Sequence, residues 1–159
     1  MTKEEFKYLF DSYFDAVRSY LFYRGAGPDE ASDLAQDVFL RLWEKQMVVD
    51  PKTAIRLLYK MAGDMYISKY RRAKLEMNYL NSLKTDRIDI SPEDQLRHKE
   101  LSINYKKALA RLSEKQRTVF LMSRMEGLKY HEIAERLKLS VKAVEKRMNL
   151  TLTFFKKVL

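Results

Sequence analysis

The chain has 159 residues, enough for one large domain or two small ones, and its four Gly and three Pro are too few for a β-sandwich or barrel. This composition favours an all-α fold. Cysteine is absent and the two histidines lie far apart in the sequence, so we expect no metal and no cofactor. No apolar segment is long enough for a membrane span or typical of a signal peptide, and we expect a cytoplasmic protein.

Positive charge dominates, with 31 Lys and Arg against 22 Asp and Glu and a net charge of +9. The charges are distributed unevenly along the chain. Residues 1–50 carry 6 basic and 10 acidic side chains, residues 51–76 carry 7 basic and 2 acidic ones, and residues 96–159 carry 16 basic and 6 acidic ones. The excess of positive charge indicates a polyanionic partner, with nucleic acid as the first candidate. Because a uniformly solvated surface needs no such segregation, the acidic front and the basic blocks indicate at least two different partner surfaces.

Three helices are expected in the first half of the chain. Apolar residues recur every three or four positions over Phe6–Leu21, which predicts a helix that ends near Gly25. A second helix is predicted from about Pro28 to Lys45, because proline and acidic residues suit a helix start. A third is predicted over Lys52–Leu75, with Gly63 as a candidate bend.

The sequence then predicts a linker at 77–95, where no clear periodicity is present and polar residues and a proline gather. A further helix is expected from about Pro92 to Leu112. The chain therefore divides into two helical domains, 1–76 and 96–159.

The second domain contains a helix-turn-helix pattern. Ser113 is a helix N-cap, the helix it opens ends at Glu126, and a helix over 130–137 is followed by the turn 138–140 and a final helix. Lys138 stands where glycine is usual, and a left-handed backbone there costs about 1 kcal/mol. The residues expected on the inner side are Ile133, Ala134, Leu137, Leu139, Val141 and Val144.

The final helix has a polar face that suits DNA. Lys and Arg bind phosphates and guanine edges, and Glu can accept a hydrogen bond from cytosine, so a helix with such a face can enter the major groove. The other interpretation is a helical corner that only packs. The candidate DNA-contacting residues are Ser140, Lys142, Glu145, Lys146, Arg147 and Asn149.

Two parts of the chain resemble the bacterial sigma-70 family. Residues 33–43, DLAQDVFLRLW, are similar to the family's region 2.2, and residues 112–121 and 126–134 are similar to region 4. The second motif also resembles response-regulator output domains, but both motifs in this order across an acidic linker are specific. The chain is thereby identified as a member of the small two-domain extracytoplasmic-function (ECF) sigma factors.

The resemblance implies that the region 2.2 helix docks on the clamp of the polymerase β′ subunit, a basic surface that the acidic first block would complement. A merely solvated helix face is the alternative. The candidate polymerase-binding residues are Asp33, Gln36, Asp37, Leu40 and Arg41.

The third helix resembles regions 2.3 and 2.4, which in the family open the −10 element and hold flipped bases. Leu57 replaces the usual Trp, Asp64 the usual Asn and Ser68 the usual Asp. Basic and aromatic groups that can follow the backbone and stack on bases remain, while Tyr59 and Tyr66 fit the core equally well. The candidate −10 residues are Arg56, Lys60, Asp64, Lys69, Tyr70, Arg71 and Arg72.

The expected function is that of a sigma factor without a catalytic centre of its own. The resemblance implies core RNA polymerase (β′ clamp and β flap), promoter DNA and an anti-sigma protein as partners, and we expect a monomer when the chain is unbound. The linker acids either mimic nucleic acid or simply belong to a flexible connection: Asp86, Asp89, Glu93 and Asp94.

Three other functions are considered. A stand-alone helix-turn-helix regulator would bind duplex DNA as a dimer on palindromic sites. An enzyme acting on nucleic acid would need a cluster of acidic residues with metal-binding spacing, which the sequence lacks. A degenerate, sigma-like adaptor is kept open by Leu57 and Asp64.

Overall fold

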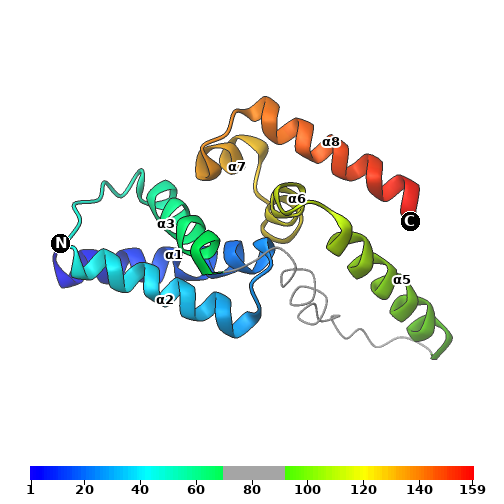
Figure 1. The fold of residues 1–159 in the computed structure, drawn as a ribbon, viewed down its shortest axis with the longest axis horizontal. Coiled ribbons are helices and arrows are strands. Elements are labelled where there is room, and N and C mark those ends of the chain that lie inside the picture. Colours follow the sequence, from blue (N-terminus) through cyan, green and yellow to red (C-terminus); the bar gives the residue numbers. More distant parts are fainter. Residues whose placement is uncertain (70–91) are drawn as a thin grey trace.

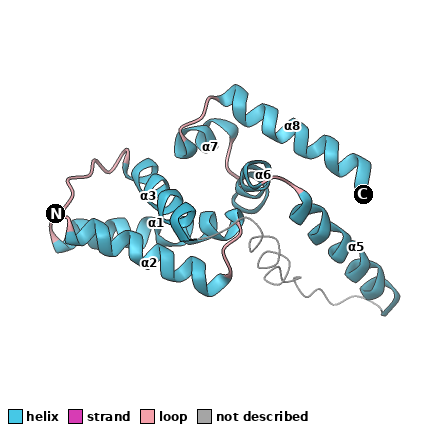
Figure 2. Cartoon of the chain, in the orientation of Figure 1, coloured by secondary structure: helices cyan, strands magenta, loops and turns pink. Residues whose placement is uncertain are grey.

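The computed structural model describes residues 1–69 and 92–159, with side chains described from 102 onward in the second range. Within these ranges every regular element is a helix, which confirms the all-α prediction (Figure 1 and Figure 2). The expected linker falls largely on 70–91, outside the described residues. The helices are α1 (Lys3–Arg24), α2 (Pro28–Glu44), α3 (Ala54–Lys69), α5 (Pro92–Arg111), α6 (Glu114–Glu126), α7 (Tyr130–Leu137) and α8 (Val141–Val158).

Helices α1 and α2 are joined by a tight turn at the positions that the sequence predicts. Gly25 ends α1 with a φ of 125°, a conformation that favours glycine, and Pro28 is the first residue of α2. Aromatic rings hold the two helices together: the ring centroids of Phe10 and Phe39 lie 5.2 Å apart in an edge-on arrangement. This packing turns the opposite, polar face of α2 toward solvent.

Helix α3 packs against both α1 and α2. The helix runs without interruption through Gly63. A Cβ atom at Gly63 would lie 2.8 Å from Arg24 Nη1, so this glycine makes room for a side chain of α1. Tyr59 and Tyr66 are each only 2% exposed and belong to the core.

The second half contains the expected helix-turn-helix. Ser113 Oγ and Ser140 Oγ accept hydrogen bonds from the backbone N–H groups of Gln116 (3.2 Å) and Ala143 (3.1 Å), which confirms both N-caps. Lys138 ends α7 in the left-handed conformation, with φ 54° and ψ 46°, as its position predicts.

One inner-side prediction is wrong in this half. Val141 is 42% exposed, because it is the first residue of α8 and lies outside the packing of α7 on α8. Val144, one turn later, is fully buried with Ile133 and Ala134.

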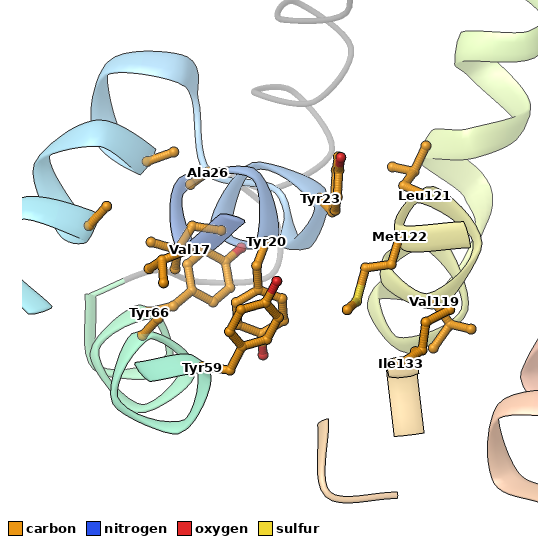
Figure 3. Packing of buried hydrophobic residues seen from close by; sticks show 14 of the residues in the cluster. Val17, Tyr20, Tyr23, Ala26, Tyr59, Tyr66, Val119, Leu121, Met122 and Ile133 are labelled. Carbon is orange, nitrogen blue, oxygen red and sulfur yellow. The ribbon is translucent and has the colours of Figure 1, made fainter. Parts of the chain in front are cut away.

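The two halves pack directly on each other, which the sequence did not predict. Helix α6 lies along the end of α1, and α7 lies against α3. In Figure 3 the tyrosines of α1 and α3 lie on one side and Met122 and Leu121 of α6 on the other, with Tyr23 facing α6. The buried residues of both halves form one cluster. None of the described helices is long and apolar enough to cross a membrane.

Replacing Lys138 with glycine is expected to raise the free energy of unfolding by up to about 1 kcal/mol, because glycine adopts the left-handed conformation without steric cost. The matched control is Lys146→Gly, an exposed position inside α8, where glycine is expected to lower stability by about 1 kcal/mol. Denaturant unfolding of both variants measures the difference. Equal destabilisation by the two substitutions would contradict the account of Lys138.

Candidate functional site

The outward face of α2 presents the polymerase-binding candidates together. Asp33, Gln36 and Arg41 are exposed, Asp37 is half-buried, and Leu40 is 53% exposed among them. A large apolar side chain surrounded by polar ones suits a protein interface, in which an apolar centre is ringed by polar contacts. The packing of Phe39 on α1 explains this orientation, because it fixes which face of α2 is turned away from the core.

A groove of about 370 Å³ separates α2 from α3 and joins two of the candidate sites. Asp37 and Leu40 of the polymerase-binding set lie on one wall, and Asp64 and Lys69 of the −10 set lie on the other. Sequence reasoning missed two wall residues, Glu44 and Met65. The full lining is Asp37, Leu40, Arg41, Glu44, Asp64, Met65, Ser68 and Lys69.

An ion pair crosses this groove. Lys69 Nζ lies 3.4 Å from Asp37 Oδ2, and both side chains are about half exposed. Exposed pairs of this kind contribute at most about 1 kcal/mol, so either partner can exchange the other for an external charge. The contact links a residue expected to face the polymerase with one expected to face DNA.

The remaining −10 candidates differ from one another in solvent exposure and in hydrogen bonding. Lys60 and Asp64 are exposed, and the Asp64 carbonyl accepts a hydrogen bond from Ser68 Oγ at 3.0 Å. Arg56 is half-buried, and its Nε has no hydrogen-bond partner. The hydroxyl groups of Tyr59 and Tyr66 donate to backbone carbonyls of α1, so both rings are part of the scaffold. Tyr70, Arg71 and Arg72 lie outside the described residues.

Helix α8 places four of its six candidates on one exposed face. Lys142, Glu145, Lys146 and Asn149 follow the spacing of one helix side, and all are exposed. Arg147 projects from the opposite side and lines a crevice between the two halves with Arg24 and Leu139. Ser140 is exposed at the N-terminal end of α8. The structure therefore separates Arg147 from the other candidates.

The described part of the chain contains no group of three or more His, Asp or Glu side chains that could hold a metal ion. Asp37 and Asp64 lie on opposite walls of the groove beside Lys69.

Comparison with known proteins gives matches in both halves. The family described as "Sigma-70 region 2" matches residues 9–74, and that described as "Sigma-70, region 4" matches residues 102–153.

Two relatives are named as sigma factors. The ferric citrate uptake sigma factor FecI of Escherichia coli is 29% identical over 143 residues, covering 89% of this chain and 83% of FecI. The RNA polymerase sigma factor YlaC of Bacillus subtilis is 29% identical over 140 residues, covering 86% of this chain and 81% of YlaC.

A solved structure shares the fold. The sigma factor RpoE, in its co-crystal structure with the anti-sigma factor NepR from Bartonella quintana, superposes with a TM-score of 0.60 at 21% identity. The superposition covers 98% of this chain and 96% of RpoE.

The chain belongs to the sigma-70 family of RNA polymerase sigma factors, in its ECF group. It binds core RNA polymerase and directs promoter-specific initiation of transcription, with the −35 and −10 elements as its targets. A stand-alone helix-turn-helix regulator would account for residues 102–153 but leaves the region 2 match over 9–74 unexplained.

Replacing both Lys142 and Lys146 with alanine is expected to weaken binding of the polymerase complex to promoter DNA, because each lysine can release a counterion from a phosphate. The slope of log binding constant against log salt should fall by roughly 1 to 2 units. Filter binding at several salt concentrations measures this slope. The control is Arg124→Ala, an exposed cation on α6; an equal loss there would contradict the assignment of the α8 face.

Proposed function

We propose that this sigma factor uses three surfaces: the outward face of α2 for the β′ clamp, the groove between α2 and α3 for the −10 element, and the exposed face of α8 for the −35 element. The observation that carries the proposal is the groove itself, since it joins Asp37 and Leu40 to Asp64 and Lys69. A docking residue and DNA-contacting residues that share one groove allow the polymerase and the opened strand to be held side by side.

Docking on the clamp is supported by charge and by shape. The α2 face combines Asp33 and Asp37 with the exposed Leu40, which offers an apolar anchor within an acidic surface. Against a basic surface, these carboxylates would set the register and raise the association rate more than the affinity. Gln36 and Arg41 complete the polar rim.

Opening of the −10 element is assigned to α3. Lys60 and Lys69 are exposed cations that can follow a single strand, and the Asp64 carboxylate can accept a hydrogen bond from a base amino group. Binding of extruded bases offsets the few kcal/mol of unpairing, so no ATP is needed. Arg56, Tyr70, Arg71 and Arg72 join this set on the strength of the family resemblance.

Reading of the −35 element is assigned to α8 in the major groove. Lys142, Lys146 and Asn149 can bond phosphates and base edges, and Glu145 can accept from cytosine. Ser140 lies at the N-terminal end of α8, the helix that would enter the major groove of DNA. Arg147 would join this contact only if the crevice between the halves opened.

The division into domains 1–76 and 96–159 follows from these assignments. The second domain would dock on the β flap through its apolar side, and the polymerase core would perform all of the chemistry. The chain would act in the cytoplasm as a monomer until it binds core polymerase. An anti-sigma protein is a proposed partner, since RpoE is bound to one in its co-crystal structure.

Run-off transcription with purified core polymerase on genomic promoter fragments tests the proposal. A start site that depends on the added chain is the expected result, and absence of any complex with core polymerase would overturn it.

Asp37→Arg places a cation where the clamp needs an acid, and it is expected to lower core affinity at least tenfold. Asp15→Arg on α1 is the matched control, since Asp15 is exposed and lies outside the α2 face.

Asp64→Asn is expected to change which −10 sequences are used, because an amide can both donate and accept hydrogen bonds whereas a carboxylate only accepts. Transcription from a library of promoters with randomised −10 elements measures the preference. Glu44→Gln, on the opposite wall of the same groove, makes the same chemical change as a control. An unchanged profile for Asp64→Asn would contradict its assignment to base contact.

A further inference from the structure

A crevice of about 230 Å³ lies where α1, α6, α7 and α8 meet. Pockets for drug-sized ligands usually measure about 300–1,000 Å³, so this crevice suits a smaller ligand. Leu137 and Leu139 form an apolar part of its wall, and the other lining side chains are polar or charged. The crevice therefore combines a low local dielectric with groups that can bind a small polar molecule.

The charge that lines this crevice is positive. Three cationic side chains, Arg24, Lys115 and Arg147, stand against one carboxylate, that of Glu114. Glu114, the first residue of α6, forms an ion pair with Arg24, the last residue of α1, so these two charges cancel. The charges of Lys115 and Arg147 remain, and the crevice carries two positive charges that its own walls do not balance.

Arg147 differs from the two neighbouring arginines in its hydrogen bonding. Arg117 of α6 is 2% exposed, and its Nε and Nη2 donate to the carbonyls of Tyr23 at 2.8 Å and Arg24 at 2.7 Å. The Arg24 guanidinium donates in turn to the hydroxyl of Tyr20 at 3.2 Å. The Arg147 guanidinium is half-buried, and within residues 1–69 and 102–159 it forms no ion pair and no hydrogen bond.

The donors in the crevice suit an anion with several oxygen atoms. A guanidinium binds phosphate through two parallel hydrogen bonds, and the ammonium group of Lys115 adds a second charge. The hydroxyl of Tyr20 accepts a bond from Arg24 and keeps its own proton to donate. Burial raises the pKa of Tyr20, so this proton stays in place at neutral pH.

Charge and direction distinguish phosphate from the other anions that the chain could meet. A phosphate group carries between one and a half and two negative charges at neutral pH, close to the two that the crevice lacks, whereas a carboxylate carries one. DNA is turned away from this place: Lys142 and Lys146 are exposed on one side of α8, and Arg147 projects into the crevice from the opposite side. A duplex seated on the exposed face of α8 therefore leaves the crevice unfilled.

We propose that this crevice is a binding site for the phosphate group of a small molecule, held by Arg147, Lys115 and the hydroxyl of Tyr20. The site does not rest on the surfaces proposed for polymerase and promoter, because binding of the phosphate is a property of the chain alone. A phosphate bound there contacts α1, α6 and α8 at once. Binding to the folded chain therefore stabilises it against unfolding.

Calorimetric titration of the full chain at constant ionic strength tests the site. Inorganic phosphate and AMP are titrated separately, and saturable binding of one anion per chain is expected. Acetate, which carries one charge, is expected to bind at least tenfold more weakly. Tighter binding of AMP would identify an esterified phosphate as the ligand, and equal or tighter binding of inorganic phosphate would identify the free ion. Absence of saturable binding by both would overturn the proposal.

A matched pair of double variants separates the crevice from the net charge of +9, which attracts anions anywhere on the chain. Lys115→Gln with Arg147→Gln is expected to weaken phosphate binding at least tenfold. Arg124→Gln with Lys156→Gln removes the same charge from exposed positions of the same two helices, and its binding is expected to stay within twofold of wild type. Equal loss in the two double variants would overturn the site.

Thermal unfolding and a conservative variant keep the test independent of how well the double variant folds. Phosphate at about 100 times its Kd is expected to raise the Tm of the wild-type chain by roughly 5 to 10 °C, compared at equal ionic strength. Arg147→Lys keeps the charge but loses the two parallel hydrogen bonds, so it is expected to bind phosphate several-fold more weakly and to show a smaller rise in Tm. Wild-type affinity in Arg147→Lys would contradict the role of the guanidinium.

Discussion

The two hydrogen bonds from Arg117 to the end of α1 are the interaction on which the packing of the two described halves depends. An arginine excluded from water must have its donors satisfied, and the last carbonyls of α1 are acceptors left over from the helix itself. Each half therefore completes the polar contacts of the other. Removing the first half would take these two carbonyl acceptors away from the Arg117 guanidinium.

Helix α3 contributes both to the core and to the groove that carries the proposed function. One side of this helix packs on α1 through two tyrosines whose hydroxyl groups are bound to backbone carbonyls. Its other side forms a wall of the groove shared with α2. The rigid side keeps the groove in shape, while the weak pair of Lys69 and Asp37 leaves its charges available to partners.

Local signals in the sequence predicted most of the helices, the two serine caps and the left-handed Lys138, because these depend on neighbours within a few residues. The resemblance to sigma factors supplied the candidate surfaces. The space that Gly63 leaves for Arg24 and the burial of Arg117 were not foreseen, since both depend on residues distant in sequence. Nothing within α6 distinguishes Arg117 from the exposed Arg124; only the approach of α1 does.

The close approach at Gly63 has a genetic consequence. A methyl group at this position would lie within 2.8 Å of the tip of Arg24, a flexible side chain that can move away without disturbing α3. The helix would tolerate alanine, but Arg24 would leave its place beside Glu114. A single-base change in a glycine codon could therefore act on a contact with the far half of the protein.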